Sequence, residues 1–293
     1  IGYGSSGKRY AKILKKYFNV STISVVTRNP QCNYKKFNKL THIKELKFDL
    51  AIICSETYKH YSQLKFLEKN FTNKKIIVEK PLFSENKKLK IRNNKVFVGY
   101  NLRFDPMIDY VKKRLKNKKI FFSNFNCFSY LPNWRNGKDY SISYSASKIK
   151  GGGVTRDLSH EIDLAYYIVN LKKIVFAANS KVSNLKINSD DTAFLLGKNI
   201  QKTIISINLN FSYHQEVRQI FLNTKKESIF IDLINRILII KNSLNEKKII
   251  FKKNNVDQTY LDLIKDVIFN KKKCCNFQEG IKINNYISKF KRI

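Results

Sequence analysis

Three glycines near the start of the chain, Gly2, Gly4 and Gly7, form the pattern G-x-G-x-x-G. Apolar residues recur every three or four positions over 10–17, which predicts a helix directly after the glycines. At such a turn the first glycine permits the change of direction, the second lets a pyrophosphate approach the backbone, and the third allows close helix packing. The pattern therefore predicts a dinucleotide-binding domain with five candidate cofactor contacts: Gly2, Gly4, Ser5, Ser6 and Gly7.

The first hundred residues alternate strand-like runs with helical patterns, as expected of a doubly wound parallel sheet of the Rossmann type. The strand-like runs cover 22–26, 49–54, 75–78 and 96–98, and a helical segment covers 61–67. The sequence begins at Ile1, directly on the glycine pattern. We therefore expect the strand before that pattern to lie mostly upstream, so that this domain is N-terminally incomplete.

After Pro106 the period changes, and apolar and polar residues alternate over 205–212. This alternation predicts a strand of an antiparallel sheet with one buried face. Further strands are predicted at 120–130, 229–233, 236–241 and 248–252, and helices near 157–169 and 260–269. The predicted fold class is α/β: a Rossmann domain over 1–104, followed over 105–293 by an α+β domain with a large, mostly antiparallel sheet for substrate binding and oligomerisation.

The chain carries 57 Lys and Arg residues against 22 Asp and Glu, a formal net charge of +35. Such a charge attracts polyanions, and one interpretation is a nucleic-acid or anionic-membrane partner. The lysines are spread along the chain, however, and the short run 271–273 belongs to no long basic tail. No apolar run approaches the ~20 residues that cross a bilayer. We therefore expect no specific nucleic-acid partner and no membrane association.

The five cysteines form no C-x-x-C pair, and the four histidines supply no zinc-binding spacing, so we expect no metal site. An odd number of cysteines without a recognisable signal peptide favours a reducing compartment. We therefore expect a cytoplasmic protein.

The residues that end the second predicted strand bear on the choice of cofactor. An acidic residue about 20 positions after the glycines normally binds the adenosine ribose of NAD. Here Thr27 and Arg28 stand at that place, and a guanidinium can bind a 2′-phosphate through two parallel hydrogen bonds. The sequence therefore favours NADP over NAD, the alternative being that Arg28 is solvated or stacks on adenine.

Four further motifs follow in order along the chain. They are Ser55, Thr57 and His60; Glu79-Lys80-Pro81; Tyr100-Asn101 with Arg103-Phe104; and the triplet Gly151-Gly152-Gly153 leading to Asp157, His160 and Asp163. With these motifs the chain resembles the Gfo/Idh/MocA family of sugar and cyclitol oxidoreductases over almost its whole length. It departs from the family at Glu56, which replaces a proline, and in the spacing of Asp157 and His160, which are three rather than four apart.

The resemblance implies a hydride transfer between NADP or NAD and a secondary hydroxyl or ketone of a sugar, cyclitol or sugar derivative. It implies that Ser55, Thr57, His60, Glu79 and Lys80 lie along the cofactor. Some members of the family are regulators, so a non-catalytic, NAD(P)-sensing protein is the alternative. Retention of both Lys80 and His160 favours the enzyme.

The residue types suit this chemistry, because oxidation of an alcohol requires a proton acceptor. His160 is the candidate general base, since the ordinary pKa of histidine, about 6.5, is close to neutral. Lys80 would stabilise negative charge on the reacting oxygen. Asp157 would share a helix face with His160, and Asp163 could orient the imidazole. The alternatives are a helix cap for Asp157, a core histidine for His160 and a solvated side chain for Lys80.

Several residues are candidates for binding the substrate. Trp134 is the single tryptophan and lies near Arg135 and Tyr140, where an indole face suits a sugar ring, although it could equally be a core aromatic. Arg103, Lys148 and Arg156 could bind a carboxylate or phosphate, as on an acidic sugar or a nucleotide sugar, and Asp157 and His160 would contact the reacting group. Aromatic residues such as Tyr213 on the polar strand faces suggest a homodimer or homotetramer formed through the antiparallel sheet.

Overall fold

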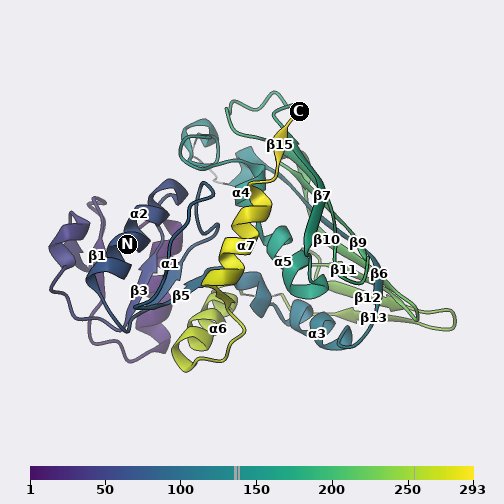
Figure 1. Cartoon of the computed structure of the whole chain (residues 1–293), viewed down its shortest axis with the longest axis horizontal. Coiled ribbons are helices and arrows are strands. Elements are labelled where there is room, and N and C mark those ends of the chain that lie inside the picture. Colours follow the sequence, from purple (N-terminus) through teal and green to yellow (C-terminus); the bar gives the residue numbers. More distant parts are fainter. Residues whose placement is uncertain (135–136, 138, 254) are drawn as a thin grey trace. The chain divides into compact units, whose positions relative to one another are not determined.

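The computed structural model describes residues 1–134, 137, 139–253 and 255–293 and contains two compact units (Figure 1). Unit 1 comprises Ile1–Asn101 and Asn255–Asn284, and unit 2 comprises Leu102–Asn254 and Asn285–Ile293. The two units correspond to two separate sheets of different type.

Unit 1 is built on a sheet with the strand order β14-β5-β4-β3. The strands β3 (Leu50–Ile53), β4 (Lys75–Val78) and β5 (Lys95–Val98) pair in parallel, and β14 (Cys275–Asn276) pairs antiparallel with β5. A separate parallel pair consists of β1 (Ser24–Val26) and β2 (Lys35–Phe37). The helices are α1 (Ser5–Tyr17), η1 (Leu40–Ile43), α2 (Thr57–Asn70), α6 (Val256–Phe269) and α7 (Phe277–Ile287), which continues into unit 2.

The parallel strands of unit 1 form the core of that unit. Strand β4 reads KIIV, and its three apolar residues have no exposed surface. Such continuous apolar runs are typical of parallel strands that are covered on both faces. Gly2 N–H donates to Val26 O (2.9 Å) and Cys54 N–H donates to Ile1 O (2.7 Å), so the start of the chain is hydrogen-bonded to the ends of both β1 and β3.

Unit 2 is built on a nine-stranded sheet with the order β13-β12-β11-β10-β6-β9-β8-β7-β15. The pairs β6–β9 and β7–β15 are parallel, and all the others are antiparallel. The strands are β6 (Ile120–Tyr130), β7 (Lys173–Ser180), β8 (Thr192–Lys198), β9 (Ile204–Asn210), β10 (Ser212–Thr224), β11 (Ser228–Asp232), β12 (Ile237–Lys241), β13 (Glu246–Ile250) and β15 (Lys291–Arg292). The helical segments are α3 (Pro106–Arg114), η3 (Leu131–Trp134), η4 (Tyr140–Ile142), α4 (Val154–Asp157) and α5 (His160–Val169), while η2 (Asn101–Phe104) begins at the last residue of unit 1.

The alternation along β9 separates the two faces of this sheet. Ile205, Ile207 and Leu209 are buried on the face against which α5 lies (Figure 1). On the opposite face, Ser206 and Asn208 exchange side-chain hydrogen bonds of 2.8 Å with neighbours on β6. The predicted fold class, a Rossmann-type domain with a second domain of mostly antiparallel sheet, is therefore confirmed.

The compact units differ from the expected division into 1–104 and 105–293, because Asn255–Asn284 packs with unit 1. The ring of Tyr260 on α6 meets that of Tyr10 on α1 edge to face, with centroids 5.1 Å apart. Cys275 pairs with Val98 at the edge of the parallel sheet. These are contacts between segments distant in sequence, which helical periodicity within α6 does not reveal.

Candidate active site

The glycine loop of unit 1 holds its shape through close backbone contacts. Gly2 has φ +89°, and a Cβ atom there would lie 2.7 Å from the amide nitrogen of Ser55. A Cβ atom on Gly7 would lie 2.4 Å from the carbonyl oxygen of Gly2. Gly4 differs from both, because a Cβ atom there would meet nothing within 4 Å. Gly2 and Gly7 are therefore required by the packing of the loop, whereas the space next to Gly4 is open.

This open space lies at the N-terminus of α1. Gly4 is the N-cap residue, no side chain caps the helix, and the first turn contains no acidic residue. The first amide groups of a helix attract anions, because they lack helical partners and lie at the positive end of the helix dipole. Backbone donors together with room for a phosphate fit the pyrophosphate of a dinucleotide, with Ser5 and Ser6 in the same first turn.

The loop after β1 is tied to the glycine loop by Asn29, which the sequence analysis missed. The Asn29 side chain donates to the carbonyl oxygen of Tyr3 (3.2 Å), and its backbone N–H donates to Thr27 Oγ1 (3.0 Å). The Thr27 hydroxyl is therefore partly used inside the loop. Arg28 is exposed to solvent beside it.

The loop after β3 carries the next predicted group of residues. The Ser55 hydroxyl donates to Gln63 Oε1 (2.7 Å), and Thr57 is buried at the first position of α2. His60 is only 1% exposed, with Nε2 3.1 Å from the carbonyl oxygen of Ser55 and Nδ1 3.1 Å from that of Pro81. His60 thus lies in the interior and faces the backbone of two loops.

Lys80 lies at the carboxyl end of β4, at the edge where Ser55 follows β3. Glu79 is buried before it, and burial raises the pKa of the Glu79 carboxyl, while the neighbouring Lys80 ammonium acts in the opposite direction. Lys80 itself is half-buried. Since the carboxyl ends of parallel strands carry the binding residues in such sheets, this edge is the expected position for a cofactor-facing lysine.

Residues of helix α6 contact α1, the helix that follows the glycine loop. Arg9 on α1 pairs with Asp257 (Nε to Oδ1, 3.3 Å), and its guanidinium lies 5.2 Å from the centre of the Tyr260 ring. Tyr10, between the glycine loop and Glu79, is almost fully buried. These supporting residues come from both ends of the chain, so local motifs gave no signal for them.

In unit 2 the glycine triplet brings a loop against the start of α4. A Cβ atom on Gly152 would lie 2.1 Å from the carbonyl oxygen of Tyr144, and Gly153 has φ +117°. The Asp190 carboxylate accepts a hydrogen bond from the Thr155 amide (2.9 Å) and so caps α4. The Tyr144 hydroxyl donates to Asp157 Oδ1 (2.5 Å), and Asp157 is 3% exposed.

The helix expected over 157–169 is two helices, which corrects the predicted geometry of Asp157 and His160. Helix α4 ends at Asp157 and α5 begins at His160. The two residues are therefore not on successive turns of one helix. The hydroxyl of a further residue, Tyr144, donates to Asp157.

His160 is half-buried at the first position of α5. The next residue, Glu161, is buried and forms an ion pair with the partly exposed Arg218 on β10 (Nε to Oε1, 2.8 Å). Arg218 also lies 3.3 Å from the sulfur of Cys127 on β6, where burial raises the pKa of the thiol to about 12. The start of α5 is thereby attached to two central strands.

The structure does not support Arg103 as a substrate contact. Its guanidinium is 1% exposed and binds the Asp163 carboxylate, with Nη2 to Oδ1 at 2.6 Å and Nε to Oδ2 at 3.1 Å. A guanidinium held in this way is part of the core of unit 2. Asp163 binds Arg103, and the expectation that it orients His160 stays a prediction.

The other predicted substrate contacts in unit 2 are Trp134 at the end of η3, Lys148 on a loop and Arg156 on α4. Trp134 is 38% exposed and packs edge-on against Phe211, and Arg156 donates to the carbonyl oxygen of Gly152 (3.2 Å). Lys148 has an exposed side chain, while its backbone N–H donates to Asn188 Oδ1 (2.8 Å). Arg135 lies outside the described residues.

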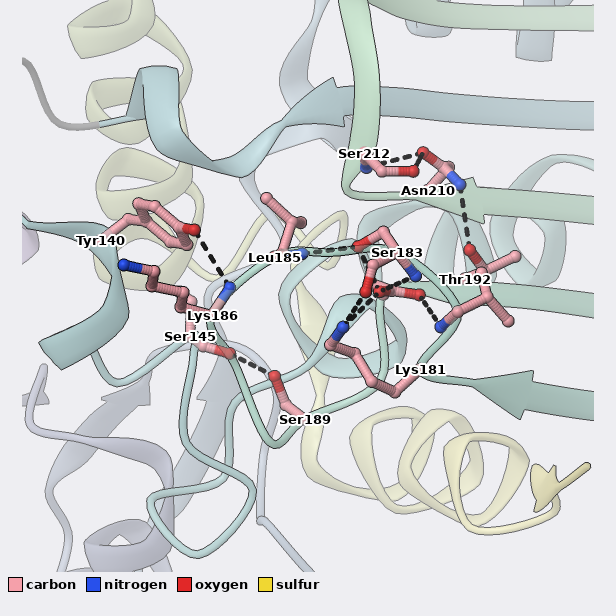
Figure 2. Close-up of polar contacts among 12 residues, drawn as sticks. Tyr140, Ser145, Lys181, Ser183, Leu185, Lys186, Ser189, Thr192, Asn210 and Ser212 are labelled. Carbon is pink, nitrogen blue, oxygen red and sulfur yellow. Dashed lines mark hydrogen bonds and ion pairs between the residues drawn. The ribbon is translucent and has the colours of Figure 1, made fainter.

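A cavity of about 380 Å³ opens between the loop that precedes the glycine triplet and the segment 186–188. Figure 2 shows how these segments are joined: the Lys186 N–H donates to the Tyr140 hydroxyl (3.0 Å), and the Ser189 hydroxyl donates to the Ser145 carbonyl (2.8 Å). The cavity is lined by Ser141, Ile142, Ser143, Ala146, Ser147, Lys150, Lys186, Ile187 and Asn188. Its lining contains two lysines and no acidic residue, although the exposed carboxylate of Asp139 accepts a hydrogen bond from Ser141 nearby.

Within the described residues, no helix combines the length and apolar character needed to cross a membrane. In the same part of the chain, His, Cys, Asp and Glu residues do not gather in a group of three or more that could hold a metal ion.

The fold is that of two-domain dehydrogenases with a Rossmann-type domain. The chain is similar to the structure of levoglucosan dehydrogenase in complex with NADH, with a TM-score of 0.84 and 15% identity over 98% of this chain and 94% of that chain. It is also similar to the WlbA dehydrogenase from Bordetella pertussis in complex with NADH and UDP-GlcNAcA (TM-score 0.77, 14% identity, 99% and 93% covered). UDP-N-acetylglucosamine 3-dehydrogenase GnnA from Acidithiobacillus ferrooxidans has a TM-score of 0.75 at 14% identity, with 98% and 93% covered. No protein-family profile and no curated protein sequence matches the chain.

Proposed function

We propose that this protein is an NAD(P)-dependent oxidoreductase of the Gfo/Idh/MocA family that acts on a secondary hydroxyl or ketone of a sugar or sugar derivative. The observation that carries the proposal is the glycine loop, in which Gly2 and Gly7 are required by packing whereas Gly4 leaves room above an uncapped helix N-terminus. The similar structures include complexes of dehydrogenases with NADH, which supports the same class of cofactor.

The bound nicotinamide would supply or accept the hydride. In unit 1, the amides of Gly4, Ser5 and Ser6 would bind the pyrophosphate, and Ser55 and Thr57 would border the cofactor from the next loop. Lys80 would donate a hydrogen bond to the reacting oxygen and stabilise its negative charge. The buried carboxyl of Glu79 fixes the strand end from which Lys80 projects.

In unit 2, His160 would take the proton from the hydroxyl during oxidation and return it during reduction. Asp157, held by the Tyr144 hydroxyl, would bind a neighbouring substrate hydroxyl. The ion pair of Glu161 with Arg218 would keep the first turn of α5, and hence His160, in place. Lys80 and His160 are thus the two protonatable groups of the proposed reaction.

We further propose an acidic sugar or a nucleotide sugar as the substrate. Lys150 and Lys186 line the cavity of unit 2, Lys148 lies on the same loop as Lys150, and Arg156 follows on α4. Their charges would attract a carboxylate or phosphate. Trp134 would contact the sugar ring. One of the similar structures was solved with NADH and UDP-GlcNAcA, which supports this class of substrate.

NADP is the proposed form of the cofactor. Arg28 is exposed directly after β1, and the oxygen of the preceding Thr27 is neutral, so a 2′-phosphate would meet a guanidinium and no carboxylate at this point. A homodimer or homotetramer through the uncovered face of the nine-stranded sheet and a cytoplasmic location stay predictions.

The test is a titration with NADPH and NADH, followed by nicotinamide fluorescence, of the wild type, Arg28→Ala and the control Lys65→Ala, an exposed lysine on α2. We expect Arg28→Ala to weaken NADPH binding roughly tenfold with little effect on NADH, and Lys65→Ala to change neither. Lys80→Met should bind NADPH but lose about 10²-fold or more in turnover of acidic sugars. Failure to bind both nucleotides would overturn the proposed function.

A further inference from the structure

The two ring nitrogens of His60 face two carbonyl oxygens, and both of these are hydrogen-bond acceptors. Nε2 lies 3.1 Å from Ser55 O and Nδ1 lies 3.1 Å from Pro81 O. A neutral imidazole has one N–H, so it can donate to one of these carbonyls while its lone pair faces the other. A doubly protonated imidazolium donates to both.

The two carbonyls belong to the two loops that form the proposed cofactor edge of unit 1. Ser55 follows β3, and its amide nitrogen would lie 2.7 Å from a Cβ atom placed on Gly2 of the glycine loop. Pro81 directly follows Lys80 at the end of β4. His60 is therefore the side chain that links the glycine loop, through Ser55, with the segment that carries Lys80.

Two influences shift the pKa of His60 in opposite directions. Burial lowers the pKa of the imidazole, whereas the carbonyls of Ser55, Pro81 and Leu82 and the charge of Glu56 raise it. Burial prevails, and the pKa lies below the ordinary value for histidine. Glu56 is exposed at the N-cap of α2 and pairs with Lys59 (2.8 Å), so part of its charge is compensated.

We propose that His60 is a positioning residue whose second proton joins the Ser55 loop to the Lys80–Pro81 segment, so that the cofactor site tightens when His60 is protonated. His60 acts from the interior and does not touch the cofactor. The proposal rests on the proposed function only in so far as these two loops bind the dinucleotide. The change in hydrogen bonding at Ser55 and Pro81 is independent of any ligand.

The first measurement uses the wild-type chain without cofactor. Histidine-detected ¹H–¹⁵N NMR from pH 5.0 to 7.5 should show His60 passing from one protonated nitrogen to two. The amide signals of Ser55 and of Leu82, which follows Pro81, should move with the same midpoint. Midpoints unrelated to that of His60, or an imidazole that keeps one proton throughout, would overturn the proposal even if the protein binds no nucleotide.

The second measurement follows NAD⁺ affinity by calorimetry over the same pH range. One hydrogen bond of ordinary strength corresponds to roughly a three- to tenfold change, and we expect the wild type and the control His42→Gln to bind that much more tightly at the acid end. His60→Gln, whose amide can donate at one end of the side chain only, should lose this pH dependence, and His160→Asn should keep it. A pH dependence that survives in His60→Gln would contradict the proposal, whereas absence of binding of both NAD⁺ and NADP⁺ at every pH would count against the proposed function alone.

Discussion

The proposed cofactor region of unit 1 and the proposed substrate region of unit 2 are held together in different ways. Around the glycine loop, contacts of backbone with backbone predominate: Gly7 lies against Gly2, and Gly2 against Ser55. Around α5, ion pairs of buried carboxylates predominate, with Arg103 bound to Asp163 and the partly exposed Arg218 bound to Glu161. The first region therefore depends on the absence of side chains, and the second on the pairing of charges.

This difference has a consequence for tolerance to change. A loop that packs backbone against backbone has no room for an added side chain. Changing a neighbouring side chain, however, leaves no buried polar group without a partner. A buried ion pair leaves an uncompensated charge as soon as one partner is removed. We therefore expect the largest losses of stability in unit 2, and the sharpest steric effects in unit 1.

The largest effect is expected for Arg103→Ala, which leaves the Asp163 carboxylate buried without its guanidinium. Breaking a buried pair in this way costs about 3–5 kcal/mol. The free energy of unfolding, measured with urea, should fall by that amount. The matched control is Lys113→Ala, which breaks the exposed Asp109–Lys113 pair on α3 and should cost less than about 0.5 kcal/mol. Equal losses in the two variants would show that unit 2 does not depend on its buried pair.

The next effect is a contrast within the glycine loop. Gly7→Ala places a Cβ atom 2.4 Å from the Gly2 carbonyl oxygen and should lower the free energy of unfolding by about 1–3 kcal/mol. Gly4→Ala meets nothing within 4 Å and should leave stability unchanged, yet its methyl group would enter the space proposed for the pyrophosphate. Urea unfolding and nicotinamide fluorescence separate the two variants. A Gly4→Ala variant that binds NADPH as the wild type does would show that this space is not the phosphate site.

The sequence could predict those parts of the fold that have local signals. Strands 75–78 and 120–130 were predicted with the observed ends, because apolar runs and alternation are local signals. The glycine spacing indicated the loop for the same reason. Strands β7 and β8 and helices α3 and α7 were not predicted, and α6 was placed in the wrong unit, since their positions depend on partners far along the chain.

The substrate region was harder to predict because its charges pair at long range. Arg103 is typical of an anion-binding residue when seen in sequence, but its partner Asp163 lies 60 residues away and takes up its guanidinium. No sequence pattern indicated Tyr144, because its hydrogen bond to Asp157 depends on Gly152, which lets the loop lie against α4. A charged residue in a sequence motif can thus be structural, and only the fold shows which partner it meets.

The last contrast concerns the pH dependence of stability, to which two carboxyl groups contribute in opposite directions. In unit 1, burial raises the pKa of Glu79, so its contribution to stability is complete below the ordinary pKa of glutamate and is lost as the pH rises through its folded value. In unit 2, hydrogen bonds and charges from Arg114 and Lys118 outweigh burial and lower the pKa of Glu227. Its contribution is present above the ordinary pKa and is lost as the pH falls. Thermal unfolding between pH 3.5 and 7.5 should therefore show that Glu79→Gln flattens the profile on the neutral side and Glu227→Gln flattens it on the acid side. The same change of profile in both variants would show that the two regions do not differ in this respect.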